Sequence, residues 1–186
     1  MDSRLANSLT ERDLVRLVGD GDPRGQRELY LRYAGYLTAV AYRYLGDEDS
    51  VKDLLQDVFI KVFEHFNKFR YRGEGSLKAW LSKIVVNDSL RELRASKHLV
   101  AVESIPEEPF DEDPEIGKVP MEVLQNMISR LPDGYRTVFN LYVFERMPHK
   151  EIASLLGIKE NSSASQLLRA KALLSREIKD YIRNNG

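Results

Sequence analysis

Residues 101–120 divide this chain into two parts that are expected to fold separately. The segment contains four prolines and seven acidic residues but only one basic residue, Lys118. Proline removes backbone hydrogen-bond donors and the like charges repel one another, so the segment predicts an extended, flexible, acidic linker. The block before it carries a net charge of +2 and the block after it +3, although the whole chain has a net charge of −1. Two mildly basic blocks therefore flank an acidic connector.

Apolar residues recur at helical spacing in both blocks, and no alternating pattern of useful length predicts a strand. Turn signals at residues 19–23 and 46–50, and Ser76 before the last apolar run, divide the first block into four helices. Thr10 is expected to cap the first helix and Pro23 to begin the second, whose apolar face would include Tyr36. The third helix is expected to run to about Phe69. We therefore expect an all-α protein of two small helical domains. The expected boundaries are residues 1–100, the linker at 101–120, and residues 121–186.

Composition excludes several classes of protein. With 42% hydrophobic and 31% charged residues the chain is typical of a foldable, soluble protein. No apolar run approaches the roughly 20 residues that span a bilayer, and the first residues lack the apolar segment of a signal peptide. The absence of cysteine excludes disulfides and Cys-ligated zinc, and the three histidines are scattered. We expect a cytoplasmic protein without membrane insertion, metal or cofactor.

A basic and aromatic loop, FRYRGEGS, joins the third and fourth expected helices. Aromatic faces stack on unpaired bases, basic side chains neutralise phosphates, and glycine lets a backbone approach a ligand closely. The loop therefore suits single-stranded nucleic acid through Arg70, Tyr71 and Arg72. The alternative is that these side chains form a solvated surface. Trp80 is expected to lie in the core, and in the alternative reading Phe69 does so too.

The third expected helix carries Asp53, Gln56 and Asp57 on its outer face. A catalytic carboxylate pair would need a nucleophile, a metal ligand or burial that shifts a pKa, and the sequence supplies none of these nearby. A solvated face or a partner-binding face is favoured, and the chain is not expected to be an enzyme.

The second block contains the spacing of a helix-turn-helix. Ala153 is small where two helices would cross, Gly157 supplies the turn and Ile158 fills the core. Asn161 is expected to cap the next helix, whose inward residues would be Leu167, Leu168 and Leu174. The polar face offered to a DNA major groove would comprise Asn161, Ser162, Ser165, Gln166 and Arg169. A plain helical hairpin for protein contacts is the alternative, and Ser163 and Ala164 depart from the usual helix-turn-helix pattern.

These residues carry a family resemblance. The runs DLLQDVFIKVF, FR and KAWLSKIVVN resemble region two of bacterial RNA polymerase sigma factors. The run LPDGYRTVFNLYVFERMPHKEIASLLGIKEN resembles their region four. Because nothing but the linker lies between them, the chain resembles the small extracytoplasmic-function (ECF) type. The resemblance extends from about Leu14 to Ile178.

The resemblance implies a factor that binds core RNA polymerase and directs promoter-specific initiation, including promoter melting, while the polymerase performs the chemistry. Region four would bind the polymerase flap, and the linker would extend towards the RNA exit path. An anti-sigma factor is a further partner that this type admits, although the sequence contains no motif for one.

The residues that would dock to the polymerase clamp helices are Asp53, Leu54, Gln56 and Asp57. Those implied at the −10 element are Arg70, Tyr71, Arg72, Lys83, Asn87, Asp88, Arg91 and Arg94, with Lys97 on phosphates. Those implied at the −35 element are Asn161, Ser162, Ser165, Gln166 and Arg169.

Three alternative functions are also compatible with the sequence. A stand-alone helix-turn-helix regulator would bind duplex DNA as a dimer, but it leaves the basic-aromatic loop unexplained. A small helical hydrolase would use Asp53 and Asp57, without a supporting histidine or third carboxylate. A protein-binding adaptor would show no promoter dependence. Within the sigma reading, the loop before Trp80 is longer than in many members, so no single residue is assigned to a base pocket. Ala164 leaves the −35 specificity open.

Overall fold

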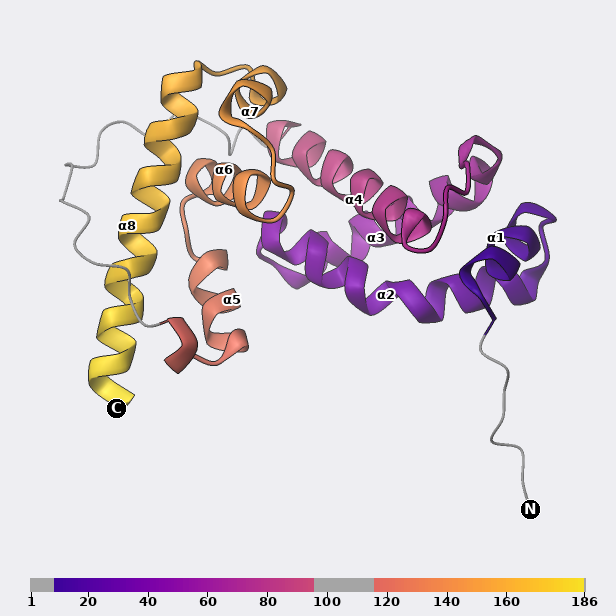
Figure 1. Cartoon of the computed structure of the whole chain (residues 1–186), viewed down its shortest axis with the longest axis horizontal. Coiled ribbons are helices and arrows are strands. Elements are labelled where there is room, and N and C mark those ends of the chain that lie inside the picture. Colours follow the sequence, from indigo (N-terminus) through magenta and orange to yellow (C-terminus); the bar gives the residue numbers. More distant parts are fainter. Residues whose placement is uncertain (1–8, 96–115, 186) are drawn as a thin grey trace. The chain divides into compact units, whose positions relative to one another are not determined.

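The structure is a computed structural model that describes residues 9–95 and 116–185, and all regular structure in these residues is helical. The prediction of an all-α fold is confirmed. The chain divides into two compact units, residues 1–42 with 47–90 and residues 43–46 with 91–186. Along the chain, the elements before the predicted linker are α1 (Glu11–Gly19), α2 (Pro23–Leu45), α3 (Glu48–Glu64), η1 (Phe66–Lys68) and α4 (Ser76–Ala95) (Figure 1). The later elements are η2 (Ile116–Lys118), α5 (Met121–Ser129), α6 (Asp133–Val143), α7 (His149–Leu156) and α8 (Glu160–Asn185).

Side-chain caps fix where the first three helices begin. Thr10 Oγ1 accepts a hydrogen bond of 3.1 Å from the backbone N–H of Asp13, and Asp47 Oδ1 accepts one of 2.8 Å from that of Ser50. The carboxylate of Asp22 likewise accepts from the backbone of α2, which begins with proline as predicted. Each cap satisfies an N–H group without a partner in the helix, and such caps contribute about 1 kcal/mol.

The third helix is shorter than the sequence predicts. The apolar pattern continues to about Phe69, but α3 ends at Glu64 and the chain then forms the short 3₁₀ turn η1. His65 leaves the helical region at φ −116° and ψ 18°, so the following residues no longer share the axis of α3. Their aromatic side chains are apolar and helically spaced, which is why the pattern alone does not reveal the break.

The core of the first unit is formed by apolar stripes on all four helices. Burying a Leu or Val side chain stabilises a fold by about 1.5–3 kcal/mol, more than a cap does. Tyr36 is an exception to the predicted stripe of α2, because it is 38% exposed, with the Lys78 ammonium 4.0 Å from its ring centre. The buried apolar residues include Leu14, Val18, Leu29, Tyr33, Leu37, Val40, Val51, Leu54, Leu55, Val58, Phe59, Val62, Leu77, Leu81, Val85, Val86 and Leu90.

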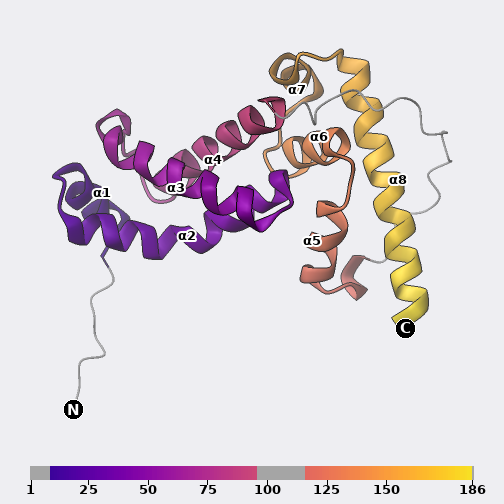
Figure 2. The same cartoon turned by 180° about the vertical axis from the view of Figure 1, so that it is seen from behind.

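Helix α1 packs against η1, and its last turn lies close to the first turn of α2 (Figure 2). A Cβ atom at Gly25 in α2 would lie 2.6 Å from Leu17 Cβ and 2.9 Å from the backbone nitrogen of Val18. Real Cβ atoms do not approach other atoms so closely. Glycine at this position therefore allows the two helices to approach as they do.

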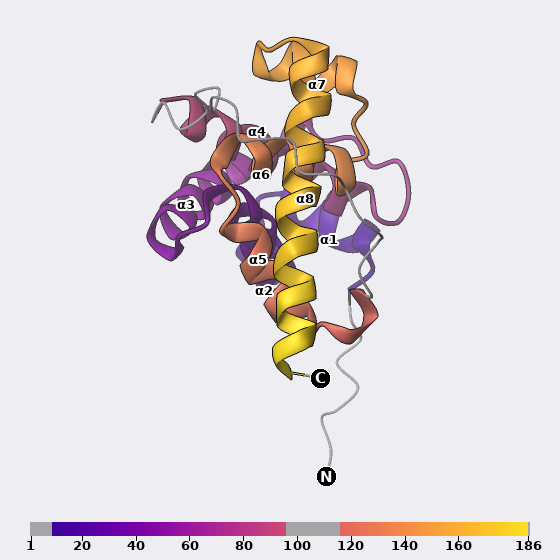
Figure 3. The ribbon, with the colours of Figure 1, turned by 90° about the vertical axis from the view of Figure 1, so that its left-hand side faces the viewer.

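Helix α8 runs the length of the second unit, and α5, α6 and α7 contact it (Figure 3). Its inward residues meet those of α5 and α6 in one apolar cluster, which comprises Val119, Met127, Leu131, Tyr135, Ala170, Leu174 and Ile178. Val119 falls within the predicted linker, yet it is buried in this cluster and follows directly after η2. The end of the predicted linker is thus not extended, while residues 101–115 lie outside the described residues.

Within residues 9–95 and 116–185, none of the helices is long and apolar enough to cross a membrane.

Candidate nucleic-acid interface and docking surface

The predicted loop starts from an aromatic cluster. The rings of Phe69 and Trp80 lie 5.1 Å apart, and Phe66 meets the edge of Trp80 at 5.8 Å. Aromatic pairs at these separations stabilise a fold beyond the area that they bury. Phe69 and Trp80 are half-buried. The cluster therefore fixes the first residue of the loop to the first turns of α4, although Trp80 is half-buried rather than fully in the core as predicted.

Two glycines shape the far side of the loop. Gly73 has φ 117° and Gly75 has φ 84°, values that residues with a Cβ rarely adopt. Ser76 closes the turn, because its hydroxyl donates to the Gly73 carbonyl at 2.6 Å and accepts from the backbone N–H of Arg72 at 3.2 Å. The glycines of FRYRGEGS thus have a conformational role in addition to the predicted close approach to a ligand.

The three predicted base-contact residues lie on the open side of this loop. Arg70 and Arg72 are exposed, and Tyr71 is half-buried. Desolvation, with the negative charges of Glu74 and Glu11, raises the pKa of Tyr71, so its ring stays neutral at physiological pH. A neutral ring between two guanidinium groups has the chemistry of a stacking platform with phosphate ligands on either side.

Helix α4, which follows the loop, carries a stripe of polar residues. Lys83, Asn87, Arg91 and Arg94 are all exposed, and their spacing places them along one face of the helix. Asp88 differs from them, because its carboxylate accepts a hydrogen bond of 2.8 Å from Lys61 Nζ on α3. This half-buried carboxylate joins two helices of its own unit, and a DNA role for Asp88 stays a prediction. Lys97 lies outside the described residues.

The predicted docking residues of α3 divide between two faces. Asp53, Gln56 and Asp57 are exposed, whereas Leu54 is only 5% exposed and packs in the core. The inclusion of Leu54 in a contact surface is therefore wrong, since an α-helix turns successive residues through about 100°. Its side chain supports the helix from inside.

An apolar groove that the sequence did not reveal lies beside these acids. It encloses about 490 Å³ between α2 and α3, and Gln56 is part of its wall. Tyr30 is 52% exposed and Ile60 is 49% exposed, although both are large and apolar. Exposed apolar residues around a groove mark protein-contact sites. The sequence does not distinguish Ile60 from core residues, because it continues the apolar pattern of a helix whose other apolar residues are mostly buried.

The second unit contains the predicted helix-turn-helix in α7 and α8. Gly157 ends α7 in the left-handed conformation, with φ 69° and ψ 31°, as its expected role in the turn requires. Ala153 is buried between the helices, as predicted. Asn161 does not cap α8, which is a correction: the helix begins one residue earlier, at Glu160, and the Lys159 carbonyl accepts its first backbone bond.

Ser163 departs from the apolar residue expected at its position, and the structure gives the reason. Its side chain is fully buried, and its hydroxyl lies 3.0 Å from Nδ1 of His149 at the start of α7. The ring of His149 is in turn stacked on that of Tyr142 at 4.7 Å. A hydrogen bond thus replaces apolar packing between the two helices of the motif.

The outer face of α8 also differs in part from the prediction. Asn161 and Ser165 are exposed, Ser162 and Arg169 are half-buried, and Leu168 is 53% exposed rather than turned inward. The carbonyl oxygen of the half-buried Gln166 side chain lies 3.1 Å from where a Cβ on Gly134 would stand. Gln166 therefore packs against α6 instead of pointing outward.

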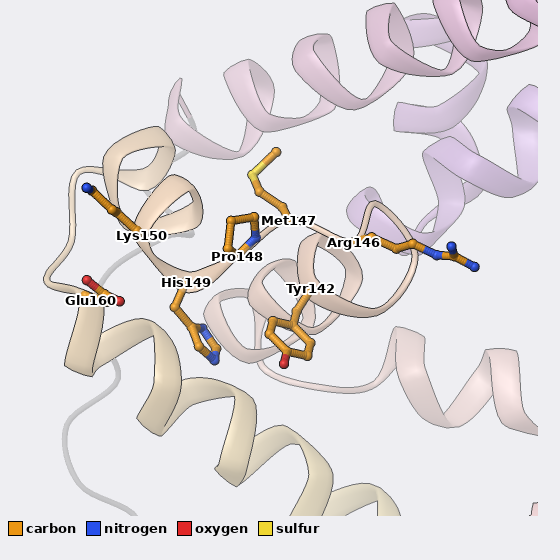
Figure 4. Close-up of a pocket in the computed structure, with 7 residues that line it drawn as sticks. All are labelled: Tyr142, Arg146, Met147, Pro148, His149, Lys150 and Glu160. Atoms are coloured by element: carbon orange, nitrogen blue, oxygen red, sulfur yellow. The ribbon is translucent and has the colours of Figure 1, made fainter.

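A cleft of about 570 Å³ opens beside the start of α7 (Figure 4). Tyr142 and His149 lie face to face along it, Lys150 and Glu160 lie at one end, and Arg146 points away from the histidine. Arg146 has a left-handed backbone at φ 54°, which is uncommon for a residue with a Cβ. Cations at this place suit the phosphates that flank a helix in a major groove.

The described residues contain no group of three or more His, Cys, Asp or Glu side chains that could hold a metal ion.

Comparison with known families matches both parts of the chain. The family "Sigma-70 region 2" matches residues 29–98, and "Sigma-70, region 4" matches residues 121–174. Together the two matches cover about two thirds of the chain. The "ECF RNA polymerase sigma-E factor" of Haemophilus influenzae is 26% identical, over 94% of this chain and 98% of its own length. The chain belongs to the ECF sigma factors.

Further relatives of this sigma factor carry the same family name. The "ECF RNA polymerase sigma factor SigM" of Bacillus subtilis is 29% identical, over 80% of this chain and 96% of the relative. Among solved structures, the "sigma factor RpoE in complex with the anti-sigma factor NepR from Bartonella quintana" is 21% identical, with a TM-score of 0.49 over 82% of this chain and 96% of that one.

In this sigma factor the region-two match includes the whole basic-aromatic loop and the stripe on α4, but not α1. The region-four match includes the helix-turn-helix and ends within α8.

Proposed function

We propose that this sigma factor binds core RNA polymerase, directs it to promoters through a −10 and a −35 element, and helps to melt the −10 region. The observation that carries the proposal is that matches to sigma regions two and four fall on opposite sides of an acidic segment, on residues with complementary chemistry. The first part offers a basic-aromatic loop, and the second offers a helix-turn-helix.

For the −10 element, the proposed surface is the loop together with the stripe on α4. Tyr71 would stack on an extruded base, with Arg70 and Arg72 on the neighbouring phosphates. Extruding a base costs a few kcal/mol of stacking, which a pocket with a basic rim offsets. Lys83, Asn87, Arg91 and Arg94 would then follow the strand, because they lie on one exposed face.

For the −35 element, α8 is the proposed recognition helix. The candidates for contact are the exposed Asn161 and Ser165 and the half-buried Ser162 and Arg169. Gln166 is a less favoured candidate for contact with the −35 element, since its side-chain amide packs against α6. A helix-turn-helix places the first turns of its second helix in the major groove, which is where these residues lie.

For polymerase docking, the proposed surface is the exposed acidic face of α3 with the apolar groove beside it. Asp53 and Asp57 would supply charge complementarity, while Tyr30 and Ile60 would supply apolar contact area. Charge complementarity speeds and orients association, whereas buried aromatic and aliphatic anchors supply most of the affinity. The clamp helices of the polymerase are the proposed partner, and the flap would bind the second unit.

We propose that the sigma factor itself is not an enzyme and that it acts in the cytoplasm, where polymerase and chromosome are found. The chemistry of initiation would belong to the polymerase. An anti-sigma factor is also a proposed partner, on the sequence resemblance alone. It would be identified as a protein whose co-expression suppresses transcription that depends on this sigma factor.

Run-off transcription tests the proposal as a whole. Core RNA polymerase of the source bacterium is incubated with genomic DNA fragments, with and without the full-length sigma factor. We expect discrete transcripts that require the sigma factor and that start downstream of a shared pair of sequence elements. The absence of such transcripts, together with the absence of binding to core polymerase, would refute the function.

The docking surface has its own test in Asp57→Arg, which reverses a charge on the proposed face. Binding to core polymerase, measured by fluorescence anisotropy of labelled sigma factor, should weaken about tenfold or more, as expected when close charge pairs are disrupted. Glu48→Arg makes the same charge change on another face of α3 and should leave the affinity nearly unchanged. Equal affinities for the two variants would contradict the assignment of this face.

A further inference from the structure

The loop of residues 69–75 is held by a carboxylate from outside the region-two match. Glu11, the first residue of α1, is only 4% exposed. Its Oε1 accepts a hydrogen bond of 3.1 Å from the backbone N–H of Leu77, and its Oε2 accepts one of 3.0 Å from that of Gly75. The hydroxyl of Tyr33 on α2 donates to the same Oε2 at 3.3 Å. Both carboxylate oxygens are therefore engaged.

These bonds replace a cap that the chain does not supply locally. The first backbone bond of α4 runs from the Ala79 N–H to the Gly75 carbonyl, so Gly75 occupies the N-cap position. A glycine has no side chain to accept from the N–H groups of the first turn. Glu11 performs this task from another helix, and its negative charge faces the positive end of the α4 dipole.

Few other contacts fix the backbone of the loop around Gly73 and Gly75. Gly73 and Gly75 both have positive φ and no side chains, so they allow many backbone conformations. The Ser76 hydroxyl closes the turn internally, and its contact beyond the segment, at 3.5 Å, is with Oε1 of Glu11 itself. Glu11 therefore connects this segment to α1 at Ser76 and at the residues on either side of it. Arg70, Tyr71 and Arg72 are on the same loop, a few residues earlier in the chain.

We propose that Glu11 is a positioning residue for single-strand recognition: its buried carboxylate fixes the loop so that Tyr71 and its flanking arginines meet an unpaired −10 base in one geometry. The inference rests on the proposed function and deepens it, since Glu11 is buried and acts only through the loop. Single-strand recognition in this sigma factor thus depends on α1, which precedes the region-two match at residues 29–98.

The test compares Glu11→Gln with Val18→Ala in the full-length chain. Glu11→Gln keeps the shape of the side chain but leaves one acceptor oxygen and places an amide N–H₂ against a backbone N–H. Val18→Ala removes apolar packing from the same helix, where Val18 is 4% exposed, and leaves the carboxylate in place. Both variants are measured under conditions where circular dichroism shows them to be fully folded.

The first measurement is amide hydrogen exchange. In Glu11→Gln, exchange at Gly75 and Leu77 should rise about tenfold or more, while exchange at the core residue Leu81 stays unchanged, because hydrogen bonds to a charged group are stronger than neutral ones. Val18→Ala should show no such local rise. Unchanged exchange at Gly75 and Leu77 in Glu11→Gln would overturn the inference, since the cap would not hold the loop in solution.

The second measurement is promoter discrimination. Holoenzyme with each variant transcribes a promoter identified by run-off, and derivatives with single-base substitutions in the −10 or the −35 element. Glu11→Gln should reduce discrimination between native and substituted −10 bases several-fold and leave discrimination at −35 intact, and Val18→Ala should change neither. Normal −10 discrimination in Glu11→Gln would overturn the inference while the sigma function stands. If the wild-type protein directs no transcription, the proposed function fails, and the role of Glu11 in recognition fails with it.

Discussion

Replacing Gly25 by alanine tests whether the close crossing of α1 and α2 is as tight as the structure indicates. An alanine Cβ would lie 2.6 Å from Leu17 Cβ, and 2.9 Å from both the Leu17 carbonyl carbon and the Val18 nitrogen. Two of these three atoms belong to the backbone, so a rotamer change cannot relieve the overlap. The two helices would have to separate by roughly 0.5–1 Å, and overpacking of this kind costs about 1–3 kcal/mol.

Gly35 provides the matched control on the same helix. A Cβ at Gly35 would meet no atom within 4 Å, and neither glycine has a positive φ. Both substitutions gain helix propensity, about 1 kcal/mol in a helix interior, so this gain largely cancels when the two variants are compared. Gly35→Ala should stabilise the first unit by about 0.5–1 kcal/mol. Gly25→Ala should be less stable than Gly35→Ala by about 1–3 kcal/mol.

Urea unfolding followed by the fluorescence of Trp80 measures this difference. The chain has only one tryptophan, and it lies in the same unit as both glycines, so the signal reports that unit even if the two units unfold separately. Equal midpoints for the two variants, or a Gly25→Ala variant more stable than Gly35→Ala, would refute the reasoning about the helix crossing.

Three further outcomes are expected. Ser163→Ala should lower the free energy of unfolding of the second unit by about 1 kcal/mol, because it leaves Nδ1 of His149 without its hydroxyl partner. Thermal unfolding measures this loss, and an unchanged transition would mean that the hydrogen bond contributes nothing to stability. Burial, with the charge of Glu11, raises the pKa of Tyr33 to about 12 from its ordinary value of 10, so its contribution to stability is complete below pH 10 and is lost as the pH rises through 12. Urea midpoints at pH 9 and pH 11.5 should therefore differ more in the wild type than in Tyr33→Phe, and equal differences would contradict this account. Lys61→Met should destabilise the first unit by about 0.5–1 kcal/mol at low salt and by less at 1 M salt, since it removes the ion pair with Asp88; an effect independent of salt would assign the loss to packing.

The sequence predicts the helices well because their signals are local. The Thr10 cap, the proline at the start of α2 and the turn glycine Gly157 each act within a few residues, and all three function as predicted. The all-α fold and the family follow from patterns of this kind. The end of α3 was misplaced because the aromatic residues after Glu64 keep a helical spacing although the backbone does not continue the helix.

Side-chain direction was harder to predict, because it depends on contacts between helices that are distant in sequence. Leu54 was assigned to a surface and is buried, whereas Leu168 was assigned to the core and is exposed. The carboxylate of Asp88 was expected to face DNA, but Lys61 lies 27 residues earlier and no pattern joins the two. Glu11 was missed for the same reason, since the two backbone N–H groups that it accepts from, at Gly75 and Leu77, lie more than 60 residues away along the chain.

The helix-crossing glycine and the cap from α1 have a consequence for exchanging parts between sigma factors. A chimera cut at residue 29, where the region-two match begins, would combine a foreign first helix with the native loop. The foreign segment would need an acidic side chain at the position of Glu11 and a glycine at the position of Gly25, which also lies before the cut. A promoter-reading module that can be transplanted from this protein therefore begins at Thr10, which caps α1, rather than at the family boundary.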